Sequence, residues 1–346
     1  MKKSALRDKD KHILYMIVES YLKVGKPISS GMVVRSSGMD ISSATVRNIM
    51  ANLEKNAYLR QPHTSAGRVP TDRGLRFYVN YLFEEALLGE RTLDLPADNL
   101  AAGSGNIETL LNKTSQLLSE YSDNMGFVIS PQVSRLAFRH LRFIKISEEK
   151  VILLLVTTSD MVLNEVLETR HYFTQVELDH ASRYLNENFR GKSLEVVRDY
   201  VLKEIPEHRL RVEDTMHKLT RLLHAYFSLE QNENQIFLQG TSKLLGKAEL
   251  FDMNRLKSLF RSFEQKAKLA KLLSDFISLD RVKVVIGSEM EIPDTADCCL
   301  ILSHYGYDNQ VLGSLGIIGP KQLPYKKIIP LVDCIAKQLS HTISYR

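Results

Sequence analysis

The chain has 346 residues, of which 44% are hydrophobic and 25% charged, a composition typical of a folded protein with two or three domains. No stretch approaches the roughly 18 apolar residues of a membrane helix, and acidic residues interrupt the signal-like N-terminus, so we expect a cytoplasmic protein without a membrane partner. The three cysteines show neither a disulfide framework nor a metal-ligand spacing.

The formal net charge of +5 is unevenly distributed along the chain. Residues 1–83 carry 14 Lys and Arg against 6 Asp and Glu, whereas the remaining residues carry 32 against 35. A basic N-terminal region on a mildly acidic remainder is typical of a protein whose first domain contacts phosphate. A basic face that is merely solvated is the alternative.

Three helices are predicted in the first 57 residues. The first begins near Asp8 and ends at Gly25, the second covers residues 28–35, and the third follows Ser42, which is a good N-cap. The third helix has an apolar stripe at three- and four-residue intervals, formed by Val46, Ile49, Met50, Leu53 and Ala57. Two short helices joined by a glycine-containing turn predict a helix-turn-helix.

The opposite face of the third helix carries candidate DNA contacts. Arg47 and Asn48 have guanidinium and amide groups of the kind that reach base edges or phosphates in a major groove. Ser43 and Thr45 lie at the start of this helix, where we expect them to anchor a phosphate. Asn52 continues this face, and no acid interrupts it.

A two-stranded hairpin with a basic tip is predicted next. Residues 58–60 and a strand that starts at Val69 flank a loop of turn-forming residues. We expect His63, Ser65 and Arg68 in this loop to contact phosphate or the minor groove, although His63 could instead only stabilise the turn. Three helices and such a hairpin make a winged helix-turn-helix.

These residues resemble the HrcA family of bacterial heat-inducible transcription repressors. The resemblance rests on SATVRN at 43–48, QPHTSAGRVPT at 61–71 and RFYV at 76–79. Two positions depart from the family pattern: Asn56-Ala57 replaces a glycine after the third helix, and Lys26 replaces a frequent acid. We expect Asn56 to take the left-handed conformation that such a glycine would take.

The rest of the chain predicts an α+β body. A helix from about 72 to 88 completes a DNA-binding domain of residues 1–88, and the Gly-, Pro- and Asp-rich residues 89–106 predict a linker. A helix near 107–121 and strands and helices up to residue 204 predict an antiparallel sheet backed by helices. The predicted strands are 126–130, 141–146, 151–157 and 161–167, and the predicted helices are 176–188 and 194–204.

A mainly helical stretch then interrupts the strands. Helices are predicted at 212–229 and 254–276, and strands resume at 281–286, 298–303 and 313–318, before a last helix at 325–343. This order indicates an insertion. The resemblance implies a GAF-like α/β body, residues 107–208 and 279–346, that carries an inserted dimerising domain, residues 209–278.

The expected function is a dimeric repressor that binds double-stranded DNA. A single winged-helix head makes few contacts, whereas a two-fold dimer on an inverted repeat combines two sets of them. The resemblance implies an inverted-repeat operator, called CIRCE, upstream of heat-shock chaperone operons, and a GroE-type chaperonin that keeps the repressor active. It implies neither a cofactor nor an enzymatic activity, and the chain lacks the phosphate-loop, H-E-x-x-H, G-x-S-x-G and C-x-x-C motifs.

Two alternatives remain at this point. In the first, the GAF-like body binds a small molecule that sets the affinity for DNA. In the second, Cys298 or Cys299 is a thiol nucleophile with His304 as its base. Both cysteines stand in an apolar strand, however, where small buried cysteines are common core residues.

Overall fold

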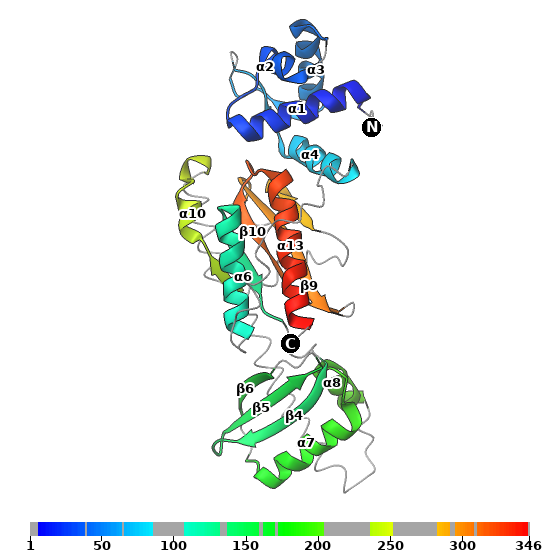
Figure 1. Ribbon diagram of the computed structural model, residues 1–346, viewed down its shortest axis with the longest axis vertical. Coiled ribbons are helices and arrows are strands. Elements are labelled where there is room, and N and C mark those ends of the chain that lie inside the picture. Colours follow the sequence, from blue (N-terminus) through cyan, green and yellow to red (C-terminus); the bar gives the residue numbers. More distant parts are fainter. Residues whose placement is uncertain are drawn as a thin grey trace.

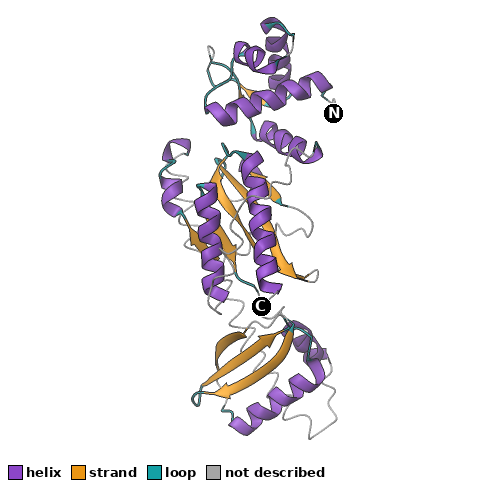
Figure 2. Cartoon of the chain, in the orientation of Figure 1, coloured by secondary structure: helices purple, strands orange, loops and turns teal. Residues whose placement is uncertain are grey.

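The computed structural model has an elongated arrangement of three units (Figure 1). It describes residues 6–38, 40–63, 66–85, 107–131, 137–158, 162–169, 172–203, 236–251, 282–290, 295–307 and 310–344. We call the first unit, residues 6–85, the head. The middle unit contains a five-stranded sheet, and the distal unit contains a three-stranded sheet with its own helices (Figure 2). Among the described helices, none has the length and apolar character that a membrane crossing requires.

The head has the predicted order of helices and strands. Its elements are α1 (Asp8–Val24), α2 (Ser30–Ser37), α3 (Ser43–Lys55), β1 (Leu59–Arg60), β2 (Val69–Pro70) and α4 (Asp72–Glu84). Helix α1 ends at Gly25, whose φ of 71° is the left-handed conformation that favours glycine. The apolar stripes of α1 and α3 are buried against each other, and β1 pairs with β2 in antiparallel orientation. The predicted spacing therefore identified the buried stripe of α3 except at Ala57, which is exposed and lies beyond the end of the helix.

The turn after α3 differs from the expected one. Asn56 has a φ of −90°, and Ala57 instead takes the left-handed conformation with a φ of 59°. The Asn56 side chain donates a hydrogen bond to the Asn52 carbonyl at 2.8 Å, which favours a position that continues the helix. An L-residue with a Cβ is therefore strained at position 57.

Replacing Ala57 by glycine is expected to stabilise the head. Relief of the left-handed strain outweighs the extra freedom of glycine in the unfolded chain, for a net gain of about 0.5 to 1 kcal/mol. Urea unfolding followed by circular dichroism measures this change. Ala51→Gly, at an exposed position inside α3, is the matched control and should lose about 1 kcal/mol. A loss of similar size in both variants would contradict the strain at Ala57.

The middle unit is an antiparallel sheet with two long helices on one face. Its strand order is β7-β3-β10-β9-β8, and α6 and α13 lie side by side across it (Figure 1). The elements are α6 (Ile107–Ser122), β3 (Met125–Ile129), β7 (Ile236–Gln239), α10 (Thr241–Leu245), β8 (Lys283–Ile286), β9 (Cys298–Tyr307), β10 (Gln310–Pro320) and α13 (Tyr325–Ser344), with short 3-10 helices at Ala248–Leu250 and Gly287–Met290.

The distal unit is a separate sheet, formed by residues that lie between β3 and β7 in the sequence. Strands β4 (Phe138–Lys145), β5 (Lys150–Thr157) and β6 (Val162–Glu168) pair only with one another among the described strands. Helix α7 (Gln175–Phe189) lies along β4, and α8 (Leu194–Lys203) follows it. Three side chains of α7 hydrogen bond to the outer backbone edge of β4, which protects that edge from other strands.

This pairing differs from the expected division of the body. Strands β4–β6 were expected to share the sheet of β3, and residues 209–278 to lie outside it. Instead β7, within that range, pairs directly with β3. The difference arises because strand pairing joins residues far apart in sequence, which local patterns do not specify. The predicted linker 89–106 and the predicted helices 212–229 and 254–276 lie outside the described residues.

Candidate nucleic-acid interface

Helix α3 presents one buried and one exposed face. The Ser42 hydroxyl accepts a hydrogen bond from the Thr45 amide at 3.1 Å, which confirms Ser42 as the N-cap. Arg47 and Asn48 are exposed on the side opposite the buried stripe. The exposed residues of this helix are Ala44, Arg47, Asn48, Ala51, Asn52 and Lys55. This face therefore combines two cations with amides and small residues and carries no acid.

The two hydroxyls at the start of α3 are engaged within the head. Ser43 Oγ lies 2.9 Å from Ser30 Oγ, which links α3 to the start of α2. Thr45 Oγ1 lies 2.9 Å from the Ser42 Oγ. Both residues are half-buried. Each hydroxyl has a further lone pair that can accept a hydrogen bond, but neither extends freely from the surface.

The hairpin places the three predicted tip residues in different environments. His63 is exposed, and Ser65 lies outside the described residues. The Arg68 guanidinium is turned inward: its Nη2 atom lies 2.9 Å from Glu54 Oε2, and its side chain is only 19% exposed. The backbone N–H and C=O of Arg68 also bond reciprocally with Ile28, each at 2.9 Å. In this arrangement Arg68 ties the hairpin to α3 and to the segment before α2.

Glu54 is the residue that sequence reasoning missed. Its Oε1 atom accepts a hydrogen bond from the backbone N–H of Gln61 at 3.0 Å, while Oε2 pairs with Arg68. Gln61 in turn donates from Nε2 to the Ala66 carbonyl at 3.1 Å. One carboxylate therefore holds both sides of the hairpin. An acid in the last turn opposes the helix dipole, and this unfavourable position is a signal that it has a specific partner.

The cysteine and histidine side chains do not form a catalytic pair. His304 lies six positions after Cys298 along β9, which corresponds to roughly 20 Å in an extended strand. His304 Nδ1 instead lies 3.1 Å from Ser314 Oγ on β10. Cys298 and Cys299 are both buried, and burial raises the pKa of each thiol to about 12. Among the described residues, no His, Cys, Asp and Glu cluster could hold a metal ion.

Thiol labelling should distinguish the three cysteines. At pH 8 the folded chain is expected to react at Cys334 alone, because Cys334 is partly exposed whereas the other two thiols are buried and protonated. The measurement counts the thiols that react with dithiobis(nitrobenzoate), by the thionitrobenzoate that the reagent releases. We expect one reactive thiol before denaturation and three after it. Cys334→Ser is the control and should abolish the native reaction. Rapid native reaction at Cys298 or Cys299 would contradict their burial.

A family model and two relatives of known name point to the same family. Residues 108–329 match the model described as HrcA protein C terminal domain. A heat-inducible transcription repressor HrcA of Geobacter sulfurreducens is 34% identical over 338 residues, which cover 98% of both chains. The protein of that name from Chromobacterium violaceum is 33% identical over 342 residues, 99% of both chains. A crystal structure described as a hypothetical protein at 2.2 Å resolution has a TM-score of 0.65 and 25% identity, over 98% of this chain and 99% of the other. The chain therefore belongs to the HrcA family.

Proposed function

We propose that this protein is a heat-inducible transcription repressor whose head binds DNA as a winged helix. The relatives named above carry that function in their names. The observation that carries the proposal is the exposed, acid-free face of α3, which lies beside a hairpin braced by Glu54. A helix of this kind fits the major groove, where Arg47 and Asn48 meet base edges or phosphates. The remaining candidates for contact with the DNA backbone are Ser43, Thr45, His63 and Ser65.

The operator is proposed to be an inverted repeat of the CIRCE type. The direct test is fluorescence-anisotropy binding to a duplex that carries the repeat, beside a scrambled duplex of equal length, across a salt series. Tight binding to the repeat alone supports the proposal. Equal and steeply salt-dependent binding to both duplexes would show a basic surface without this specificity.

Arg47→Ala is expected to separate base reading from phosphate binding. If Arg47 reads a base, operator affinity falls about tenfold while affinity for the scrambled duplex and the salt slope change little. Lys23→Ala, which removes an exposed cation from α1 outside the predicted interface, is the matched control. An equal loss on both duplexes would assign Arg47 to a phosphate.

The dimer is proposed to form through the open face of the distal sheet. Cross-strand neighbours Ile144, Ile152 and Val166 form one apolar row on this face, and Val156 pairs with Val162 two rows away, beyond the row of Arg142, Leu154 and Asn164. Val162 and Val166 are 56% and 49% exposed. Such a row of aliphatic side chains is unusual on a solvated sheet, and a second copy of the chain can bury it. The inserted unit would then be the dimerising one, with bounds that include β4–β6.

The control input is proposed to be a GroE-type chaperonin, as the resemblance implies. The test is to heat the repressor briefly, return it to the binding temperature with or without chaperonin and ATP, and measure operator binding. Recovery that depends on the chaperonin supports the proposal. Full spontaneous recovery would leave the chaperonin without a role in operator binding.

A small-molecule-gated regulator is the second candidate function. A cavity of about 550 Å³ opens between the head and the middle unit, with polar groups that include Arg60, Asp72, Arg73 and Lys321 in its walls. A ligand of the native state raises the melting temperature. Thermal unfolding of the chain with anionic metabolite pools therefore tests this candidate. If no pool raises the melting temperature, the candidate is rejected.

A further inference from the structure

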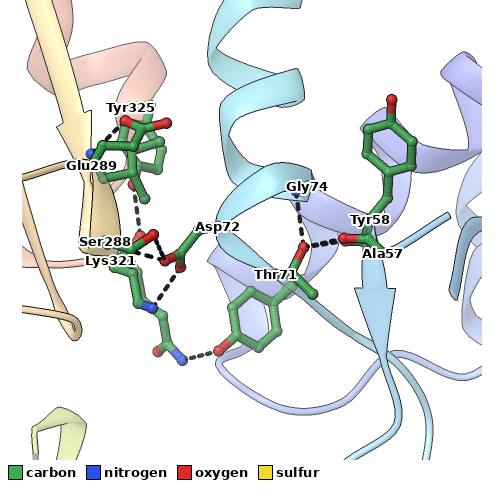
Figure 3. Close-up of polar contacts among 12 residues, drawn as sticks. Ala57, Tyr58, Thr71, Asp72, Gly74, Ser288, Glu289, Lys321 and Tyr325 are labelled. Carbon is green, nitrogen blue, oxygen red and sulfur yellow. Dashed lines mark hydrogen bonds and ion pairs between the residues drawn. The ribbon is translucent and has the colours of Figure 1, made fainter. Parts of the chain in front are cut away.

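Helix α4 is attached to the end of α3 through one side of its first turn. Thr71, directly before α4, accepts a hydrogen bond from the Gly74 amide at 3.2 Å and donates from its hydroxyl to the Ala57 carbonyl at 2.7 Å (Figure 3). Arg73 Nη1 donates to the Asn56 carbonyl at 2.9 Å. The first turn of α4 therefore holds the two residues that immediately follow α3.

The other side of the same turn is attached to the middle unit. Asp72 Oδ1 pairs with Lys321 Nζ at 2.6 Å, and Oδ2 accepts hydrogen bonds from the Ser288 amide and hydroxyl, both at 3.3 Å (Figure 3). Gly287 makes this approach possible, because a Cβ built there would lie 2.5 Å from Asp72 Oδ2. Its φ of 52° also favours glycine.

A second attachment lies one turn further along α4. Arg76 Nε donates to Glu289 Oε1 at 2.8 Å, and Arg76 Nη2 pairs with Glu289 Oε2, so the two side chains form a bidentate pair. Arg76 Nη2 also donates to the Val284 carbonyl at 2.6 Å. The Ile286 amide donates to Glu289 Oε2 at 2.9 Å, which holds the carboxylate in place.

Helix α1 makes a third attachment, beside α4. Glu19 Oε1 pairs with Lys326 Nζ at 2.7 Å, and the Tyr21 hydroxyl is hydrogen bonded to Gln322 Nε2. Both partners lie where β10 leads into α13. An isolated exposed ion pair stabilises little, but attachments from two helices restrict both the tilt and the rotation of the head.

We propose that Asp72 and Arg76, with their partners Lys321 and Glu289, are specificity-determining residues that fix the angle of α3 relative to the middle unit. They do so without touching DNA, so that a dimer recognises the spacing between two half-sites. This inference rests on the proposed binding of an inverted repeat by a dimer.

The helical geometry of DNA makes such a fixed angle selective. Each base pair inserted between two half-sites moves them apart by about 3.4 Å and rotates one relative to the other by about 35°. A head with a fixed angle meets the groove at one spacing only. A loosely tethered head accepts several spacings, with a lower affinity for each because binding must first order it.

The test uses full-length variants changed on the body side, so that the DNA-contacting surface stays intact. Lys321→Gln and Glu289→Gln, singly and together, are compared with the unchanged chain. Lys247→Gln is the matched control, because it removes a lysine of similar exposure that pairs with Asp123 within the middle unit. Affinities are measured for duplexes whose half-sites are moved apart or together by one, two and five base pairs.

The unchanged chain and Lys247→Gln should lose at least about tenfold in affinity at each changed spacing. The double variant should bind its best duplex several-fold more weakly, and its preference among spacings should fall below about threefold. A double variant that keeps the full spacing preference would overturn the inference while leaving the proposed function intact. Failure of the unchanged chain to distinguish the repeat from scrambled DNA would instead reject the proposed function.

A measurement without DNA addresses the head directly. Spin labels at Arg35→Cys in α2 and Gln116→Cys in α6, in a Cys334→Ser background and diluted with unlabelled chain, report the distance between head and middle unit. The labelled chain should show one narrow distance distribution, and the added Lys321→Gln and Glu289→Gln changes should broaden it. A broad distribution before these changes, or a narrow one after them, would overturn the fixed angle.

Discussion

Val166→Glu is expected to convert the dimer to a monomer and to weaken operator binding by about 100-fold or more. In a two-fold dimer each substitution occurs twice, so two carboxylates would face an apolar surface. Burying an unpaired carboxylate is strongly unfavourable, and two of them also repel each other. A monomer retains one head, and therefore loses the gain in affinity that comes from binding two linked half-sites.

The exposed position of Val166 makes this variant informative. Its side chain lies on the open face of the distal sheet, so the substitution should leave the fold of the chain intact. Light scattering after size-exclusion chromatography measures the oligomeric state, and circular dichroism confirms folding. Val176→Glu, at a 65% exposed position on α7, is the control and should remain dimeric. A dimeric Val166→Glu protein would place the interface elsewhere.

Local sequence patterns were sufficient to predict the elements of the head. The burial of Val46, Met50 and Leu53 follows from their three- and four-residue spacing, and the start of α3 follows from the capping hydroxyl of Ser42. These features depend on residues within one or two helical turns. They could therefore be predicted without knowing what the helix packs against.

The pairing of strands could not be predicted in the same way. Strand β3 is followed directly by β4 among the described strands, yet it pairs with β7, whose residues come about a hundred positions later. Both β3 and β5 are apolar segments, and nothing in their composition states which sheet they enter. The prediction followed the order of the strands in the sequence, and it therefore placed β3–β6 in one sheet although their hydrogen bonds divide them between two.

The direction of the Arg68 side chain also depended on a distant residue. An arginine in a basic loop is ordinarily a candidate phosphate contact, and this was the prediction. Glu54, 14 positions earlier, lies close enough in the fold to pair with it. The hairpin brings these residues together only after β1 and β2 have paired, so spacing in the sequence does not indicate the contact.

Glu54→Gln is the prediction that separates these two interpretations of Arg68. If the Glu54–Arg68 pair holds the hairpin against α3, loss of the carboxylate charge should weaken operator binding by about tenfold to thirtyfold. The reason is that the partly buried guanidinium then lacks its anion and the hairpin is no longer held in one position. Arg68→Ala should cause a similar loss, and neither change should alter the salt slope, because no phosphate contact is removed.

Simple electrostatics predicts the opposite sign, which makes the outcome decisive. Removal of an acid from a DNA-binding domain should raise its affinity for DNA. Asp40→Asn, at an exposed acid before α3, is the matched control and should show that small increase. The comparison is made by anisotropy on the operator duplex at several salt concentrations. If Glu54→Gln behaved like Asp40→Asn and Arg68→Ala reduced the salt slope by about one, Arg68 would be a phosphate contact, and Glu54 would only restrain it in the absence of DNA.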